Sequence, residues 1–296
     1  MSQFEVSTLS QCSFTLGEGP AYDPSRDAAF WFDIVGRKLR RYSFRDQQIQ
    51  TFDLPVMASA LFRIESEDER YCLATETGLQ FFDPRTGELE MYQPIEADNP
   101  HTRSNDARVH PSGALWFGTM RKNAEPDAGA IYALTGGELH VVEPHWSIPN
   151  AICFSANGGT AMLADTAEDR IYSIAIDPKT GLPTGNKVLF ADYRIRDGSP
   201  DGAVMDRYDV LHVAVWGGGR IDRITPDGRF LDPIPMPASQ VSCPVFVGED
   251  ASALLVTSAM QGLDGAALGA DRQAGDTFYV TGNFQGRHDK PVRLAR

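Results

Sequence analysis

The run ALWFGTM at residues 114–120 decides the fold, because runs of similar length and apolar character recur along the chain. Each run is too short for a buried helix and is rich in the residues that favour β-strands. The runs follow one another at intervals of roughly 40 to 50 residues, a spacing that signals a solenoid or a propeller. The six runs are AAFWFDI (28–34), RYCLAT (70–75), ALWFGTM (114–120), TAMLADT (160–166), VLHVAVW (210–216) and SALLVTS (252–258).

The residues around each run repeat as well. A second strand-like segment follows each run, then often a turn such as DPRTG (83–87) or DPKTG (177–181), and usually a third strand-like segment. One more short strand precedes the run, as in GPAYD (19–23) and AICFS (151–155). Helical periodicity is almost absent. Four antiparallel strands per repeat, six times, predict an all-β six-bladed β-propeller in which residues 1–296 form a single domain.

The last repeat lacks an obvious fourth strand before the end of the chain. We expect the N-terminal segment FEVSTLS (4–10) to supply it and to close the ring, which would remove the exposed sheet edges. The segment PVRLAR (291–296) competes for the same place. A six-repeat solenoid is less favoured, because the strands are joined by hairpins and neither end has a polar capping repeat.

Composition excludes several classes of partner. The 296 residues include 27 Lys and Arg against 40 Asp and Glu, a formal charge of −13, which argues against binding to nucleic acid or to an anionic membrane. No stretch approaches the roughly 20 apolar residues that span a bilayer. The start MSQFEVSTLSQC resembles no secretory signal, and the four scattered cysteines are expected to be buried free thiols. We therefore expect a cytoplasmic protein.

The repeats can be aligned on one apolar residue of the strand that precedes each run, and the polar residues then fall into register. The aligned residues are Tyr22, Phe62, Val109, Phe154, Met205 and Phe246. The residues four places earlier are Glu18, Ala58, Asn105, Asn150, Asp201 and Ser242. In a propeller the first strand of each blade lines the central channel, so equivalent positions converge near the axis. Four of the six carry carboxylate or amide oxygens.

Two carboxylates that meet near an axis repel each other and are costly to bury unpaired, and a divalent cation resolves that conflict. Carboxylate and amide oxygens without His or Cys favour a hard ion such as Ca²⁺, Mg²⁺ or Mn²⁺. Any one of these residues alone would be interpreted as a strand cap. The repeat-matched set instead predicts a metal site with coordination positions open to water and substrate.

The segments that hold these residues resemble the gluconolactonase/regucalcin family (SMP-30/gluconolactonase-like) of six-bladed propellers. The likeness follows the family's order from about Leu16 to Val280. The matching segments are LGEGPAYD (16–23), SNDARVHPSGALWFGTM (104–120), IPNAICFSANGGTAMLADT (148–166), SPDGAVMD (199–206), ITPDGRFLDPIPMP (224–237) and QAGDTFYV (273–280).

The resemblance implies roles for particular residues. Glu18, Asn150 and Asp201 match the family's ligands to one divalent cation, which could be Ca, Mg, Mn, Zn or Fe. Arg103 and Asn105 match residues that hold the substrate. After the GTM segment the family often has acidic residues that reach the substrate, whereas this chain has RKN (121–123). Lys122 is therefore a further candidate for substrate binding.

The resemblance also implies an activity, the metal-dependent opening of a small sugar lactone to its aldonic acid. Asp201 is the candidate general base, because a carboxylate that ligates the cation can also reach water bound beside it. One alternative is a metal-dependent phosphotriester or organophosphate hydrolase, and another is a non-catalytic propeller that binds calcium or a protein partner. Monomer and dimer both remain open.

A few further side chains are of a type that could belong to the site. His101 and His145 lie four and five residues before Asn105 and Asn150, and exposed loop positions are favoured for both over the channel mouth. His212, inside an apolar strand, is expected in the core. Tryptophans at residues 31, 116 and 216 occupy similar places in their repeats, which favours blade packing over contact with a substrate.

Overall fold

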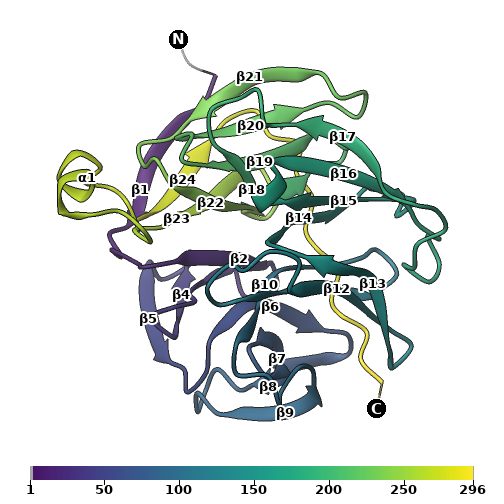
Figure 1. Ribbon diagram of the computed structural model, residues 1–296. Coiled ribbons are helices and arrows are strands. Elements are labelled where there is room, and N and C mark those ends of the chain that lie inside the picture. Colours follow the sequence, from purple (N-terminus) through teal and green to yellow (C-terminus); the bar gives the residue numbers. More distant parts are fainter. Residues whose placement is uncertain (1–2, 296) are drawn as a thin grey trace.

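Four-stranded antiparallel sheets arranged around a central channel make up the computed structural model, which describes residues 3–295 (Figure 1). The predicted all-β architecture, with six blades of four strands, is confirmed. The apolar run of each repeat forms the second strand of its blade, buried on both faces by the neighbouring blades. That double burial explains why these strands read as continuous apolar runs rather than as alternating ones.

Five blades each use four consecutive strands, which run in order from the channel to the outer edge. They are β2 (Gly17–Asp23), β3 (Ala28–Asp33), β4 (Lys38–Ser43) and β5 (Gln48–Asp53) in blade 1; β6 (Ala58–Ile64), β7 (Glu67–Thr75), β8 (Gly78–Phe82) and β9 (Leu89–Pro94) in blade 2; β10 (Thr102–Val109), β11 (Leu115–Arg121), β12 (Gly129–Thr135) and β13 (Glu138–Trp146) in blade 3; β14 (Pro149–Phe154), β15 (Thr160–Asp165), β16 (Arg170–Ala175) and β17 (Val188–Asp192) in blade 4; and β18 (Ser199–Met205), β19 (Leu211–Trp216), β20 (Arg220–Ile224) and β21 (Phe230–Pro235) in blade 5.

The sixth blade joins the two ends of the chain. It contains β22 (Val241–Val247), β23 (Ala253–Ser258) and β24 (Thr277–Thr281), and β1 (Glu5–Ser10) pairs with β24 as its outer strand. The prediction that the N-terminal segment closes the ring is confirmed. The competing C-terminal segment does not take this place, because Val292 bridges Ile64 of blade 2 instead, and residue 296 lies outside the described residues.

Helix is scarce, as the sequence predicts. A single turn of 3-10 helix, η1 (Thr166–Glu168), follows β15, and a short α-helix, α1 (Gly265–Ala270), lies between β23 and β24. Neither element, nor any other helix among residues 3–295, has the length and apolar character that crossing a bilayer requires.

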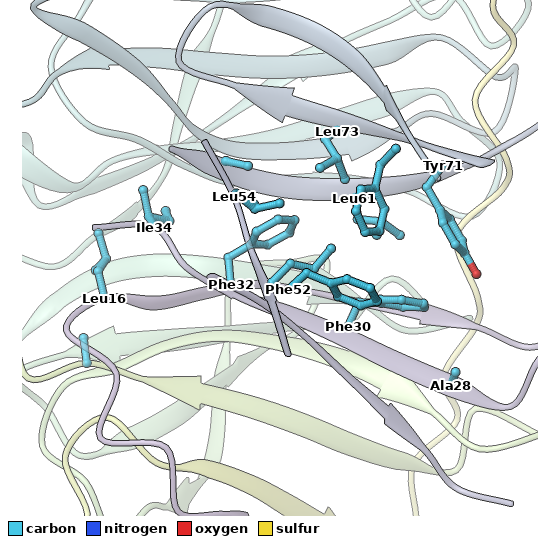
Figure 2. Close-up of a cluster of buried hydrophobic side chains, with 14 residues drawn as sticks. Leu16, Ala28, Phe30, Phe32, Ile34, Phe52, Leu54, Leu61, Tyr71 and Leu73 are labelled. Carbon is cyan, nitrogen blue, oxygen red and sulfur yellow. The ribbon is translucent and has the colours of Figure 1, made fainter. Parts of the chain in front are cut away.

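Apolar clusters fill the spaces between neighbouring blades. In one of them, Phe30, Phe32 and Phe52 of blade 1 face Leu61 and Leu73 of blade 2 (Figure 2). Fully burying a side chain of this size contributes roughly 1.5–3 kcal/mol relative to leaving it exposed, and the packing repeats around the ring. The blades therefore hold one another at fixed angles, which fixes the positions of the inner strands.

The C-terminal segment, residues 282–295, crosses the ring and contacts every blade (Figure 1). Each contact is made at the turn after an inner strand or at the end of that strand. The contacts are His288 with Tyr22, Val292 with Arg63, Arg293 with Gly113, Arg287 with Phe154, Gln285 with Arg207, and Gly286 with Ala251, in order from blade 1 to blade 6. We call this segment the strap. It spans the end of the channel at which the inner strands finish.

An ion pair with one buried partner, Arg108, ties the strap to the channel. Arg108 Nη1 lies 2.7 Å from Asp289 Oδ2, and the two side chains are 7% and 41% exposed. Arg108 Nη2 also donates to the carbonyl of Ala203 in blade 5 at 2.8 Å. The arginine thus links three parts of the molecule at once, and Asp289 is the acidic partner that neutralises it.

Replacing Asp289→Asn should lower the free energy of unfolding by about 1–2 kcal/mol, because Arg108 stays buried while its charged partner is lost and Asp289 is itself partly solvated. Urea unfolding of both proteins measures the difference. Asp250→Asn, at an exposed turn position, is the matched control. A variant as stable as this control would contradict the role given to the strap.

Candidate functional site

A cavity of about 250 Å³ opens at the other end of the channel, where the inner strands begin. One part of its wall is apolar, formed by Leu16, Met120, Ala124, Ile148 and Trp216. The polar part is formed by Glu18, Arg103, Asn105, Asn150, Thr166, Asp201 and Gln261. Four of these polar residues occupy the equivalent positions that the repeat register singled out, and they come from blades 1, 3, 4 and 5.

A break in strand pairing directs these side chains into the channel. In every blade the register between the first and second strands shifts at the same place, for example between Glu18 and Ala21 and between Asn150 and Cys153. Such bulges re-aim a side chain and end regular pairing. The residues after Glu18 and Asn150 have positive φ, +54° at Gly19 and +49° at Ala151. The local bend is therefore part of how each residue reaches the cavity.

Two glycines of the site segments are required by close approach. A Cβ on Gly19 would lie 1.8 Å from the carbonyl oxygen of Ser59 in blade 2. A Cβ on Gly202 would lie 2.4 Å from Cys243 Sγ in blade 6. Because real Cβ atoms do not approach other atoms so closely, any side chain here would push apart the inner strands that carry Glu18 and Asp201.

The side chains of the two asparagines differ in their hydrogen-bond partners. Asn105 Nδ2 donates to Asn150 Oδ1 at 3.0 Å and to the carbonyl of Pro149 at 2.9 Å, while Asn105 Oδ1 accepts from Arg103 Nη1 at 2.6 Å. The Asn105 oxygen thus already faces a positive charge, the guanidinium of Arg103. Of the four oxygen-bearing register positions, this leaves Glu18, Asn150 and Asp201 with oxygens available for a ligand.

The remaining two register positions contribute no ligand oxygen. Ala58 has no polar side-chain atom. The Ser242 hydroxyl is fully buried and donates to the carbonyl of Gly17 at 2.5 Å, so it joins blade 6 to blade 1. The polar side of the cavity is consequently asymmetric, with its ligand-type oxygens on blades 1, 4 and 5.

The two carboxylates at this site are poorly solvated. Burial raises the pKa of Glu18 to about 8, against an ordinary 4.5; the Gly19 N–H lowers it and the nearby Asp106 charge raises it further. Burial, followed by repulsion from Glu18, raises the pKa of Asp201 well above its usual range. The same burial lowers the pKa of Arg103 to about 10, although both carboxylates oppose that shift. One guanidinium therefore does not balance the two carboxylates.

The donor set fits a hard divalent cation. Three oxygens of two types converge on one cavity, and a cation of charge +2 would offset the cost of ionising both buried carboxyl groups there. Among residues 3–295, no group of three or more His, Cys, Asp or Glu side chains is placed to hold a metal ion. The candidate centre differs from such a group because its third ligand is the amide of Asn150.

A family model described as SMP-30/Gluconolactonase/LRE-like region matches residues 16–260 of the chain. The chain belongs to this family. The matched residues include all of the candidate site residues, from Glu18 to Asp201, and all six inner strands in full.

Individual relatives within this family match almost the whole chain. A Rhizobium meliloti protein provisionally named a sugar lactone lactonase is 41% identical over 98% of this chain and 98% of its own length. L-arabinolactonase of Azospirillum brasilense is 33% identical, over 93% of this chain and 91% of its own. A solved structure from Agrobacterium tumefaciens, described as the calcium-binding protein regucalcin, has a TM-score of 0.95 at 40% identity and covers 98% of each chain.

The structure brings Arg103, Asn105 and the three candidate ligands to one cavity. It does not bring Lys122 there. Lys122 Nζ lies 2.5 Å from Glu76 Oε2 and donates to the carbonyl of Pro100 at 2.8 Å. Its part in substrate binding stays a prediction. His101 and His145 are exposed and do not line the cavity, whereas His212 is buried.

Sequence reasoning missed three residues of interest. Trp216 was expected to pack like the other tryptophans of its strand position, but Trp31 and Trp116 are fully buried while Trp216 is only partly buried and lines the cavity. Thr166 lines it too, outside the aligned register. Asp106, beside Asn105, accepts from the Ile152 amide at 2.7 Å and ties blade 3 to blade 4. The adjacent Asn-Asp pair was the available signal for Asp106.

The raised pKa of Glu18 predicts how stability depends on pH without a cation. The unfolded chain loses this proton near the ordinary value of 4.5, and the folded chain keeps it until about 8. Between these values the folded state binds more protons, so stability conferred at low pH is lost as pH rises toward 8. In the presence of a chelator, the unfolding free energy should therefore fall from pH 5 to pH 8.

Glu18→Gln should flatten this dependence and should be more stable than the parent at pH 8, because the substituted amide never ionises. Denaturant unfolding across that pH range measures it. Glu88→Gln, at an exposed turn, is the matched control and should keep the parental slope. Parallel curves for the parent and Glu18→Gln would show that ionisation of Glu18 does not cause the pH dependence of stability.

Proposed function

We propose that this protein hydrolyses a small sugar lactone to the corresponding aldonic acid with the help of one divalent cation. The observation that supports this most is the convergence of Glu18, Asn150 and Asp201 with Arg103 on a single cavity of about 250 Å³. Relatives that match over more than nine-tenths of the chain are named for lactone hydrolysis, among them L-arabinolactonase. The four free cysteines fit a reducing compartment such as the cytoplasm.

The oxygens of Glu18, Asn150 and Asp201 would hold the cation. When bound, such an ion acts as a Lewis acid that polarises a carbonyl and stabilises negative charge on its oxygen. The relative described as a calcium-binding protein supports a hard cation in general, and the all-oxygen donor set agrees with it. Ca, Mg, Mn, Zn and Fe all remain candidates for its identity.

The chain's own groups account for the proton transfers. Asp201 has a second carboxylate oxygen that would take a proton from the attacking water as the water oxygen bonds to the lactone carbonyl carbon. The ring C–O bond then breaks, and the same proton returns from Asp201 to the leaving ring oxygen. A bound cation favours the ionised form of a neighbouring carboxyl group, so Asp201 would be deprotonated and able to accept this proton.

Arg103 and Asn105 would bind the substrate. A guanidinium has five N–H donors, and the Arg103 bonds to Asn105 Oδ1 and to the Ser104 carbonyl use Nη1 alone. Nε and Nη2 would then donate to ring hydroxyls or to the oxygen that gains negative charge. The bond to Asn105 holds the guanidinium in place before substrate arrives, so less orientational freedom is lost on binding.

The cavity suits a small molecule. A volume of about 250 Å³ is enough for one monosaccharide ring. The polar and apolar parts of the wall suit a sugar, which has hydroxyls on its edge and C–H groups on its faces. Trp216 is the aromatic side chain of that apolar wall.

A panel of substrates separates this function from its alternatives. We expect aldonolactones to be opened, the activity to disappear with a chelator, and added cation to restore it, all followed with a pH indicator. Turnover of a phosphotriester but no lactone would replace the proposal with the phosphotriesterase alternative. Cation binding without turnover of either ester would favour the non-catalytic alternative.

Asp201→Asn should lower kcat on the best lactone by roughly 10²–10⁴-fold at saturating cation, because the amide cannot accept the proton from water. Initial rates across a cation titration separate this effect from weaker cation binding. Asp232→Asn, at an exposed strand position, is the control and should keep parental rates. Parental kcat in Asp201→Asn at saturating cation would rule out Asp201 as the base.

Trp216→Ala should raise KM for the lactone by about 3–10-fold while kcat changes little, because an aromatic face contributes on the order of 0.5–1.5 kcal/mol to such a contact. Trp216→Phe should retain most of the affinity. Steady-state kinetics with the lactone measures both. An unchanged KM in Trp216→Ala would return Trp216 to a packing role alone.

A further inference from the structure

Thr166 lies where two of the candidate ligand strands meet. It is the first residue of η1, directly after β15, and it lines the cavity. Asn150 Nδ2 lies 2.8 Å from Thr166 Oγ1, and Thr166 Oγ1 lies 2.7 Å from the carbonyl oxygen of Pro200. Pro200 immediately precedes Asp201. One hydroxyl therefore joins the ligand side chain of blade 4 to the ligand strand of blade 5.

The direction of these bonds follows from their chemistry. A hydroxyl has one proton, and a carbonyl oxygen can only accept, so Thr166 must donate to Pro200. The Thr166 oxygen is then left to accept, and the group that faces it on Asn150 must be the NH₂. This places the Asn150 oxygen on the other side of the amide, where Asn105 Nδ2 donates to it at 3.0 Å.

Without this constraint the Asn150 amide has two orientations related by a half-turn, and only one of them offers oxygen to a cation. Asn105 also favours the oxygen-inward orientation through its donated hydrogen bond. Thr166 acts from the opposite side and is the contact that also reaches blade 5. The amide is thus fixed at both ends before any cation arrives.

The backbone of Thr166 is itself held firmly. Its N–H donates to the carbonyl of Ile148 at 3.1 Å. The preceding residue, Asp165, is buried and accepts from the amides of Ser147 at 2.9 Å and Ala167 at 3.1 Å. Since these contacts do not use the Thr166 hydroxyl, removing that hydroxyl should leave the turn intact and change only the link between Asn150 and Pro200.

We propose that Thr166 is a positioning residue of the cation site: its hydroxyl orients the Asn150 amide with oxygen inward and sets the spacing between Asn150 and Asp201. The inference rests on the proposed cation site. Groups that orient metal ligands commonly contribute 10- to 100-fold to metal affinity. Thr166 would therefore act on cation binding through the Asn150 amide.

Calorimetric titration of the full chain with Mn²⁺ alone tests this proposal. Thr166→Val, which keeps the shape and loses the hydroxyl, should raise the Kd for Mn²⁺ by roughly 10- to 100-fold. Thr166→Ser, which keeps the hydroxyl, should stay within about 3-fold of the parent, a rescue that a loss of packing would not give. Thr160→Val, at the other end of β15, is the matched control and should bind as the parent does.

Parental Mn²⁺ affinity in Thr166→Val, or an equal loss in Thr166→Ser, would overturn the inference while leaving the cation site standing. A parent chain that takes up no Mn²⁺, Ca²⁺ or Mg²⁺ would overturn the proposed cation site and this inference together. Thermal unfolding of each variant in chelator completes the experiment, since Thr166→Val should remain folded and a loss of fold in that variant alone would assign Thr166 a structural role instead.

Discussion

The pairing of β1 with β24 is the contact on which the rest of the molecule depends, because it joins the first residues of the chain to the last blade and closes the ring. A closed ring fixes the angle between neighbouring blades, and the apolar clusters between blades then have a defined shape to fill. The inner strands contact one another in order, β2 to β6 and onward to β22, and β22 returns to contact β2. Positions that are about 45 residues apart in sequence thereby face a common axis.

Closure also has an electrostatic consequence. It brings Glu18 and Asp201, on blades 1 and 5, into one buried space together with the guanidinium of Arg103. Burial raises both carboxyl pKa values, and repulsion adds to the shift, from Asp106 at Glu18 and from Glu18 at Asp201, so the chain alone holds these groups at an energetic disadvantage once they ionise. A bound divalent cation would relieve that disadvantage. On this account, a bound cation would recover the folding free energy that the chain alone loses when these carboxyl groups ionise. That recovered free energy would add to the affinity for the cation.

Much of this arrangement was predictable from the sequence because the fold turns a sequence period into a spatial one. Aligning the repeats was enough to select Glu18, Asn105, Asn150 and Asp201, which share one strand position. The same alignment could not separate Asn105 from the ligands, since that distinction depends on the hydrogen bond from Arg103. The closing strand was predictable too, because an open sheet edge needs a partner.

What the sequence could not show depends on contacts between blades. Thr166 is outside the aligned position, and its task arises from a carbonyl of the next blade. Trp216 shares its strand position with Trp31 and Trp116, yet only its surroundings place it on the cavity wall. Lys122 was selected by its place after the GTM segment, whereas its side chain is bound by Glu76. A repeat pattern gives each residue a position on its blade but not the neighbour that it meets.

The most direct test of the central claim is the position of a bound cation. Crystals of the protein soaked in Mn²⁺ and measured for anomalous scattering would locate the ion without reference to activity. The account predicts one strong peak in the cavity, coordinated directly by oxygens of Glu18, Asn150 and Asp201, with Asn105 outside the coordination sphere. Strong peaks elsewhere and none in this cavity would contradict it.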